Sequence, residues 1–369
     1  MEIYVARAVA LFALVAALLA AATPGHAQSP AFRVDPYWPK PLPNNWLLGQ
    51  VGGIAVDAQD NIWVFQRPRS LTDDEKGAAL TPPRSKCCVP APSVLVFNQA
   101  GDLIKSWGGP PAPGENPPYD WPQQEHGILV DGKGFVWLSG NGKGDNMVLK
   151  FTVDGKFVKQ IGKSGPLTGS TDLSQFGQVA ALAFDKAANE VYAADGYGNH
   201  RVAVFDADTG AIKRIWGAYG KPPTDDNLPP YNPDSLQFAN PVHCIALGKD
   251  GLVYVCDRTN NRVQVFRKDG SFVREFVIDP QTQGPGSTWG LAFSPLDRKQ
   301  KYFVLIDGTN NVIETVRRKD GVVVGTYGRQ GRETGEFHFV HVGKFDSRGN
   351  FYTGEVDTGK RLQKWVPAE

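Results

Sequence analysis

The stretch HCIALGKDGLVYVCDRTNNRVQVF, from His243 to Phe266, decides the fold. It holds three short apolar runs, divided first by the turn sequence from Gly248 to Gly251 and then by a polar corner. Apolar residues that alternate with polar ones around Gly, Asp and Asn turns are typical of antiparallel hairpins. The stretch therefore predicts a unit of strand, turn, strand, corner and strand.

The same unit recurs along the chain, which is the signature of a repeat architecture. Its copies read GGIAVDAQDNIWVF from Gly52, HGILVDGKGFVWLS from His126, AALAFDKAANEVYAAD from Ala180, HCIALGKDGLVYVCD from His243, WGLAFSPLDRKQKYFVLID from Trp289 and HVGKFDSRGNFYTGE from His341. Apolar runs after the copies predict third and fourth strands, such as VLVF (94–97) and DLIKSWG (102–108). The long insertion from Pro68 to Ser93 and the Pro-rich connectors at 108–119 and 222–233 are expected to form loops on one face.

Two corners carry a more specific signal. The motifs NHRVAVF, from Asn199, and NNRVQVF, from Asn260, resemble NHL repeats. Together with the six units, this resemblance predicts an all-β fold, a six-bladed β-propeller of NHL-type repeats. The sixth unit ends at Trp365 without a fourth strand, so the segment Phe32–Asp35 is expected to supply it and close the ring. An open β-solenoid or a pair of β-sandwiches is the alternative.

Residues 1–27 have the features of a signal peptide. Arg7 precedes an apolar run from Ala8 to Ala22, and small residues follow at Gly25-His26-Ala27. The run is short and rich in Ala for a membrane span, so no stable membrane insertion is expected, although an uncleaved anchor is the alternative. The sequence thus predicts an exported protein, periplasmic or secreted, whose residues 28–369 form the propeller.

The charge balance excludes one class of partner. The chain has 39 basic and 38 acidic residues and no cluster of Lys or Arg that would mark a nucleic-acid surface. Hydrophobic residues make up 41% of the chain, enough for a large core. The expected partner is a small-molecule or peptide substrate, and the sequence leaves the oligomeric state open.

Three histidines occupy one repeat position. His126, His243 and His341 each begin an innermost strand and each precede a Gly by eight residues. They fall in blades two, four and six, so they should surround the central channel with threefold pseudosymmetry. Three neutral imidazoles with a fourth position left open are the ligands of a catalytic zinc site. The sequence therefore predicts a metal ion, Zn²⁺, held by these histidines, the alternative being polar residues that fill a wet channel.

Three further residues lie at the corners after second strands. Arg67, Arg258 and Tyr197 belong to blades one, four and three, at the blade ends where the inner strands begin. Two cations and a phenol are thus expected around the metal site, where the arginines would bind a substrate carboxylate. Tyr197 would act as a general base if nearby positive charge favoured its phenolate form. Each also has a structural alternative, such as an ion pair between Arg258 and the corner residue Asp257.

At this point the chain resembles the peptidyl-α-hydroxyglycine α-amidating lyases, which are zinc-containing six-bladed propellers. The resemblance covers nearly all of residues 28–369 and rests on short motifs. It implies that His126, His243 and His341 bind zinc, that Tyr197, in the sequence DGY, is catalytic, and that Arg67 and Arg258 belong to the active site.

The sequence also departs from that family. An Asp that follows the third histidine and helps bind calcium is Val342 here, a Met before that histidine is Phe339, and a disulfide Cys after the tyrosine is Gly198. A structural Ca²⁺ is therefore not expected. The substrate pocket is expected to differ as well, so that another carbinolamide or a ureidoglycolate-like molecule is as suitable a substrate.

Three functions compete for this pattern. The first is a metal-dependent carbon–nitrogen lyase that cleaves a carbinolamide to an amide and glyoxylate. The second is a non-catalytic NHL propeller that binds a peptide or protein partner. The third is a propeller hydrolase such as a lactonase, which ranks last because lactonase propellers hold their metal with Glu and Asn.

The four cysteines allow three pairings. Cys244 and Cys256 lie across one hairpin and can bridge if the register suits, although a strict four-residue turn would place Cys256 opposite His243. Cys87 and Cys88 are expected to form a bridge in the long insertion, with a redox-labile clip or a second metal-binding spot as alternatives.

Overall fold

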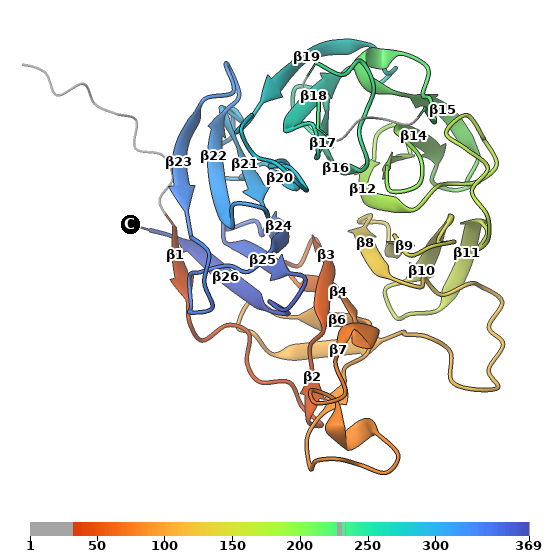
Figure 1. The fold of residues 1–369 in the computed structure, drawn as a ribbon, viewed down its shortest axis with the longest axis vertical. Coiled ribbons are helices and arrows are strands. Elements are labelled where there is room, and N and C mark those ends of the chain that lie inside the picture. The colour runs from red at the N-terminus through yellow and green to blue at the C-terminus, as the bar shows by residue number, and fades with distance from the viewer. Residues whose placement is uncertain (1–31, 227–230, 233, 369) are drawn as a thin grey trace, which may run out of the picture.

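Six four-stranded antiparallel sheets surround a central axis in the computed structural model, which describes residues 32–226, 231–232 and 234–368 (Figure 1). Within each sheet the strands follow one another from the axis outward. The chain is therefore an all-β six-bladed propeller, as the sequence predicts. The predicted signal peptide, residues 1–27, lies outside the described residues, and no helix among those described is long and apolar enough to cross a membrane.

The strands fall where the repeats predict them. From the axis outward, the blades comprise β3 (Gln50–Val56), β4 (Ile62–Arg67), β6 (Val94–Phe97) and β7 (Leu103–Trp107); β8 (Glu125–Val130), β9 (Phe135–Gly140), β10 (Met147–Thr152) and β11 (Phe157–Gly162); β12 (Val179–Asp185), β13 (Glu190–Asp195), β14 (Arg201–Asp206) and β15 (Ile212–Trp216); β16 (Val242–Leu247), β17 (Val253–Asp257), β18 (Arg262–Phe266) and β19 (Phe272–Val277); β20 (Gly290–Ala292), β21 (Tyr302–Asp307), β22 (Val312–Arg317) and β23 (Val323–Tyr327); and β24 (Val340–Phe345), β25 (Phe351–Glu355), β26 (Leu362–Pro367) and β1 (Phe32–Asp35).

The N-terminal strand closes the ring. β1 pairs antiparallel with β26, so that Phe32 faces Pro367 and Asp35 faces Lys364. The first and last described strands thus share one sheet, as Figure 1 shows beside the C-terminus. β1 is the fourth strand of blade six, and the closure predicted from the sequence is confirmed.

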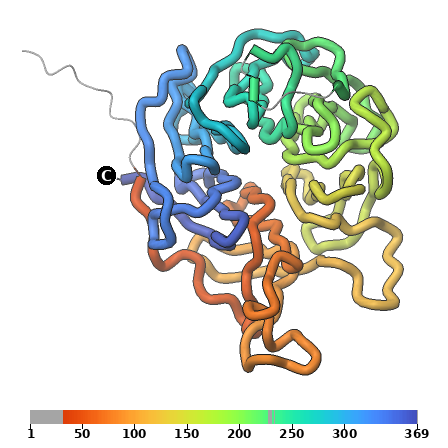
Figure 2. The backbone as a smooth tube through the Cα atoms, in the orientation of Figure 1, coloured from red at the N-terminus to blue at the C-terminus, as the bar shows by residue number. Residues whose placement is uncertain are grey.

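The long insertion of blade one lies between β4 and β6 and projects from the ring (Figure 2). It contains two 3-10 helices, η1 (Pro68–Ser70) and η2 (Gly77–Ala79), while a third, η3 (Ala218–Gly220), follows blade three. A short parallel pair, β2 (Trp46–Leu47) with β5 (Val89–Pro90), ties the end of the insertion to the segment that precedes blade one.

The hydrophobic core lies between neighbouring blades. Each of its clusters combines residues of two adjacent sheets, for example Phe65 with Leu138 between blades one and two, and Trp137 with Phe205 between blades two and three. This follows from the strand pattern, because side chains that alternate across a sheet present an apolar face to each neighbouring sheet. The packing fixes the blades around the axis and so positions the inner strands.

All four cysteines form disulfides. Cys244 and Cys256 form a disulfide across β16 and β17. Leu247 pairs with Val253 at the end of the hairpin, and this register places Cys244 opposite Cys256. That turn is longer than the strict turn that would place Cys256 opposite His243. Cys87 and Cys88 form a vicinal disulfide in the blade-one insertion.

Candidate metal centre

An irregularity in the inner strand positions each of the three histidines. In β16, Val242 pairs with Asp257 and Cys244 with Cys256, so that His243 has no residue of its own opposite it. The same shift occurs at His341 in β24 and at His126 in β8. A β-bulge of this kind redirects a side chain out of the ordinary alternation. Here the bulge lies at the first residues of each inner strand, beside the channel.

The three imidazoles meet on the axis. His126, His243 and His341 are 2%, 4% and 3% exposed. One nitrogen from each lies within 4.8 Å of the others, and their ring centroids are 4.8 to 5.2 Å apart. The structure therefore brings together three residues that are far apart in the sequence.

Each histidine is braced by the next blade around the ring. The Nδ1 atom of His126 bonds the carbonyl oxygen of Ala180 at 2.7 Å, and that of His341 bonds the carbonyl of Val51 at 3.2 Å. Nδ1 of His243 bonds the carbonyl of Trp289 in the same way. Because a carbonyl only accepts, Nδ1 carries the proton, and the lone pair of the neutral ring lies on Nε2. The three Nε2 atoms are therefore the ones that can donate a lone pair to a metal ion.

The local electrostatics keep these rings neutral. Burial lowers the pKa of each histidine well below its ordinary value, and the neighbouring histidines and arginines lower it further. Neutral imidazoles with a fixed tautomer are the form that binds a transition metal. Around a tetrahedral zinc ion such nitrogens lie about 3.3 Å apart, so a small inward movement of the rings completes the fit. The residues present therefore suit zinc.

Tyr197 joins the histidines at the same point. It follows β13, and its Oη lies 3.1 Å from Nε2 of His126 and 3.0 Å from Nε2 of His243. Arg258 donates from Nη1 to the same oxygen at 3.2 Å. The phenol is half-buried and lies between the metal donors and a cation. A single hydroxyl thus contacts two blades besides its own.

Arg67 lies against the neighbouring blade. Only 7% exposed, it donates from Nε to the carbonyl of Glu125 at 2.7 Å, next to His126. Its other nitrogens bond the side-chain oxygens of Gln50 at 2.8 Å and Asn141 at 3.3 Å. The sequence did not single out these two amides, because neither stands at a repeated position. They hold the guanidinium without neutralising it.

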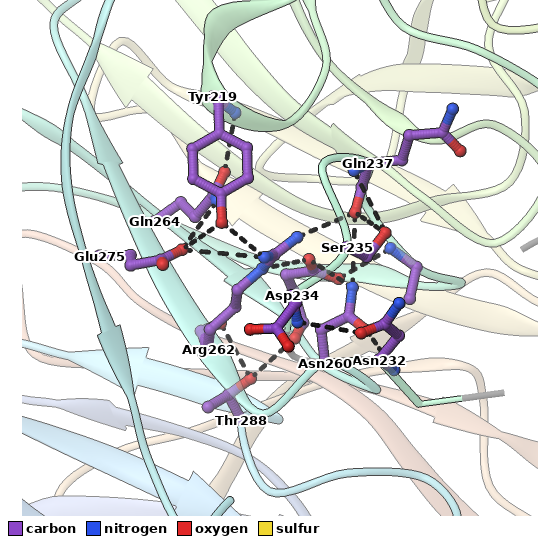
Figure 3. A network of polar contacts seen from close by, with 12 residues as sticks. Tyr219, Asn232, Asp234, Ser235, Gln237, Asn260, Arg262, Gln264, Glu275 and Thr288 are labelled. Atoms are coloured by element: carbon purple, nitrogen blue, oxygen red, sulfur yellow. Dashed lines mark hydrogen bonds and ion pairs between the residues drawn. The ribbon is translucent and has the colours of Figure 1, made fainter. Parts of the chain in front are cut away.

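Arg258 does not pair with the corner aspartate, so that structural alternative is wrong. Its Nε bonds the carbonyl of Pro285 at 3.0 Å, and its guanidinium lies 4.2 Å from the ring centroid of Trp289. Asp257 pairs instead with Arg262 at 2.8 Å, where both side chains are fully buried. Figure 3 shows Arg262 within that network, bonded also to Tyr219 and Gln237. Blade four thus uses Arg262 for structure and has a second arginine, Arg258, beside the site.

Two other histidines lie outside the centre. His200 bonds the carbonyl of Thr224 at 3.2 Å within its corner. His338 pairs through Nε2 with Asp357 at 2.8 Å. The Nε2 atom of His338 is therefore engaged away from His341.

Comparison with known proteins gives a consistent picture. A family model of the NHL repeat matches residues 242–266. NHL repeat-containing protein 3 of Mus musculus is 28% identical over 366 residues, which cover 92% of this chain and 85% of that protein. The probable peptidyl-alpha-hydroxyglycine alpha-amidating lyase of Caenorhabditis elegans is 26% identical over 222 residues, which cover 59% of this chain and 56% of that protein.

Solved structures agree on the fold. A streptogramin B lyase aligns with a TM-score of 0.53 at 14% identity, covering 91% of this chain and 98% of that one. At this identity the likeness shows the fold alone. The sequence comparisons and the geometry together make this chain an NHL-repeat six-bladed propeller, distantly similar to amidating lyases, with a buried triad of histidines able to hold a metal.

Proposed function

We propose that this protein is a zinc-dependent carbon–nitrogen lyase that cleaves a carbinolamide bearing a carboxylate into an amide and glyoxylate. The observation that carries the proposal is the position of the Tyr197 hydroxyl. It lies within 3.1 Å of two metal-donor nitrogens and 3.2 Å from Arg258. A proton acceptor, a metal site and a cation thus meet at one point. The distant similarity to an amidating lyase supports the same chemistry.

The chain's own residues divide the work. The metal held by His126, His243 and His341 would supply Lewis acidity toward an oxygen of the substrate. Tyr197 would act as the base that removes the proton of the α-hydroxyl. The O–H electron pair forms the aldehyde C=O while the C–N bond breaks, and the departing nitrogen takes back the proton. The products are an amide and an aldehyde acid, and the proton balance of Tyr197 is restored.

Positive charge suits the substrate carboxylate. No carboxylate pairs with Arg67 or Arg258 among the described ion pairs, whereas Arg201 and Arg262 are both neutralised by aspartates. Burial lowers the pKa of Arg67, an effect that the nearby Tyr197 and Glu125 oppose. An anionic substrate group would offset the charge of both arginines, and such charge-assisted bonds are strong. The expected substrate is therefore a small molecule or peptide end with a carboxylate beside the reacting carbon.

The donor set bears on the competing functions. A lactonase-type propeller is disfavoured because its metal is held by Glu and Asn, whereas three histidines converge here. A binding module without catalysis would need no metal ion. It would also not need a tyrosine hydroxyl placed against the histidine nitrogens that bind such an ion. We further propose that the protein acts after export, which is what the signal peptide predicted at residues 1–27 would bring about.

The first prediction concerns Tyr197. Purified protein is expected to contain one zinc ion per chain and to release glyoxylate from α-hydroxyglycine amides or ureidoglycolate. Tyr197→Phe keeps the ring but removes the proton acceptor, so turnover should fall roughly 10²- to 10⁴-fold while the metal stays bound. Metal content is measured by mass spectrometry and glyoxylate by a coupled assay.

Matched controls separate the roles. Tyr37→Phe, at an exposed tyrosine, should leave turnover unchanged. His243→Ala should lose the metal, whereas His200→Ala should retain it. A wild-type protein that holds zinc but releases no glyoxylate from either substrate class would overturn the lyase proposal and favour the binding module.

A further inference from the structure

A single lysine side chain lies in the central channel beyond the three histidines. Lys344 follows His341 by three residues in β24 and lines the same channel, whose empty volume is about 490 Å³ including its open end. Its side chain has no hydrogen bond, ion pair or ring contact with any described residue. It is the one Lys, Arg, Asp or Glu among the described residues that line this channel.

The register shows that this lysine is exceptional. Lys344 pairs across its hairpin with Tyr352. The equivalent positions of the other blades, which face Trp63, Trp137, Tyr192, Tyr254 and Val304, are Ala55, Leu129, Ala183, Ala246 and Ala292. Those five residues pack in the apolar clusters between neighbouring blades and do not line the channel, whereas Lys344 does. The charge is therefore placed in an otherwise apolar ring.

No acidic group in the described part of the chain offsets this charge. Burial lowers the pKa of Lys344, and no neighbouring charge contributes to the shift. At the other end of the triad lie two more cations, Arg67 and Arg258, and the histidines themselves are neutral. Buried ions in proteins are normally paired, because leaving water costs more than packing returns. The channel thus attracts anions along its length and supplies no anion of its own.

We propose that Lys344 forms an anion-binding site in the central channel, separate from the metal centre, for a small monovalent anion such as a halide or a short carboxylate. The surrounding side chains are Ile54, Ile128, Leu182, Ile245 and Leu291. They give the channel apolar walls and limit the size of the ion. The site requires neither the metal nor turnover, so it stands or falls independently of the proposed lyase activity.

The test compares anions at constant ionic strength. The melting temperature of wild-type protein is measured in sodium gluconate, whose bulky anion does not fit, and during replacement of gluconate by chloride or by formate. A saturable rise of roughly 2–4 °C is expected. The anion that saturates at the lower concentration shows whether the site selects a halide or a carboxylate.

Variants assign the effect to the channel. Lys344→Met should abolish the anion response and, in gluconate alone, be at least as stable as wild type, because it removes a partly buried charge that has no partner among the described residues. Lys249→Met removes one exposed positive charge and should keep the full response. An unchanged response in Lys344→Met, or an equal loss in both variants, would overturn the proposal.

A direct observation covers the case in which Lys344→Met does not fold. Crystals of wild-type protein grown in sodium bromide should show an anomalous peak within about 3.5 Å of the Lys344 ammonium, as expected for a charged donor and a halide. A channel without that peak would contradict the site.

Discussion

At the scale of single residues, the corner between second and third strands distinguishes blade five. In blades three, four and six an arginine opens the third strand and pairs with a carboxylate that ends the second. These pairs are Arg201–Asp195 at 2.7 Å, Arg262–Asp257 at 2.8 Å and Arg361–Glu355 at 2.8 Å. Blade five has the carboxylate, Asp307, but Val312 in place of the arginine. Without a cation, burial raises the pKa of Asp307 to about 6.

Glu314, in the third strand of the same blade, gives a pH-dependent prediction. Burial, together with the negative charge of Asp279, raises its pKa from the ordinary 4.5 to about 9. The folded protein therefore holds a proton that the unfolded chain releases, so the stability this proton provides is complete below pH 4.5 and is lost as the pH rises toward 9. Glu314→Gln should raise the free energy of unfolding at pH 8 by at least about 1 kcal/mol and change it less at pH 5.

Urea unfolding at the two pH values measures this effect. Glu333→Gln, at an exposed glutamate, is the control and should change stability equally little at both. A destabilised Glu314→Gln at pH 8 would mean that the carboxylate is ionised and bound to a partner in the folded state.

At the scale of strands, close contact between blades one and two places His126. Gly52 occupies in blade one the position that histidine holds in blades two, four and six. A Cβ there would lie 2.3 Å from the carbonyl oxygen of Glu125 and 2.9 Å from Cα of His126. The absence of a side chain thus lets β3 approach the start of β8, and the bulge in β8 then directs the imidazole to the axis.

Gly52→Ala should therefore weaken metal binding without unfolding the ring. The added methyl group must push β8 away, which displaces one of three ligands. A 10- to 100-fold loss of zinc affinity is expected, the size typical of a lost supporting contact. Competition with a chromophoric chelator measures the affinity, and the circular dichroism spectrum serves as the control. Unchanged affinity would mean that the inner strands move independently of the imidazole.

The strands also show how far the sequence leads. Six repeats and three histidines in register predict the blades and the meeting of the imidazoles, because both follow from a period that can be read along the chain. The Cys244–Cys256 pairing stayed open, since one residue more or less in the turn reverses which side chains face each other. The contact of Tyr197 with two histidines, and the amides Gln50 and Asn141 behind Arg67, depend on corner conformations for which the sequence has no period.

At the scale of the whole molecule, β1 joins the two ends of the described chain. Besides its pairing with β26, Phe32 packs against Tyr327 at a centroid distance of 5.5 Å, so it also contacts blade five. Removing residues through Asp35 would leave β26 as an open sheet edge beside the apolar cluster of Phe337 and Trp365. Open edges of this kind pair with other chains.

The shortened chain should melt several degrees lower than the full chain and associate as its concentration rises. Scanning calorimetry and sedimentation velocity measure both effects. As a control, Phe32→Ala should lower the melting temperature less and leave the protein in the association state of wild type. A truncated protein with the melting temperature and association state of the full chain would show that the ring holds without its closing strand.

The hydrogen bonds behind the imidazoles couple the positions of the six blades to the geometry of the triad. Blades two, four and six supply the nitrogens, and blades three, five and one supply the carbonyls that hold them. An ion that draws the nitrogens inward therefore pulls on every blade, on three of them directly and on three through a carbonyl. Any motion that moves the blades away from the axis must also separate the Nε2 atoms of the three histidines. The affinity for the ion and the stability of the closed six-bladed ring are consequently coupled, so that a change that weakens one weakens the other.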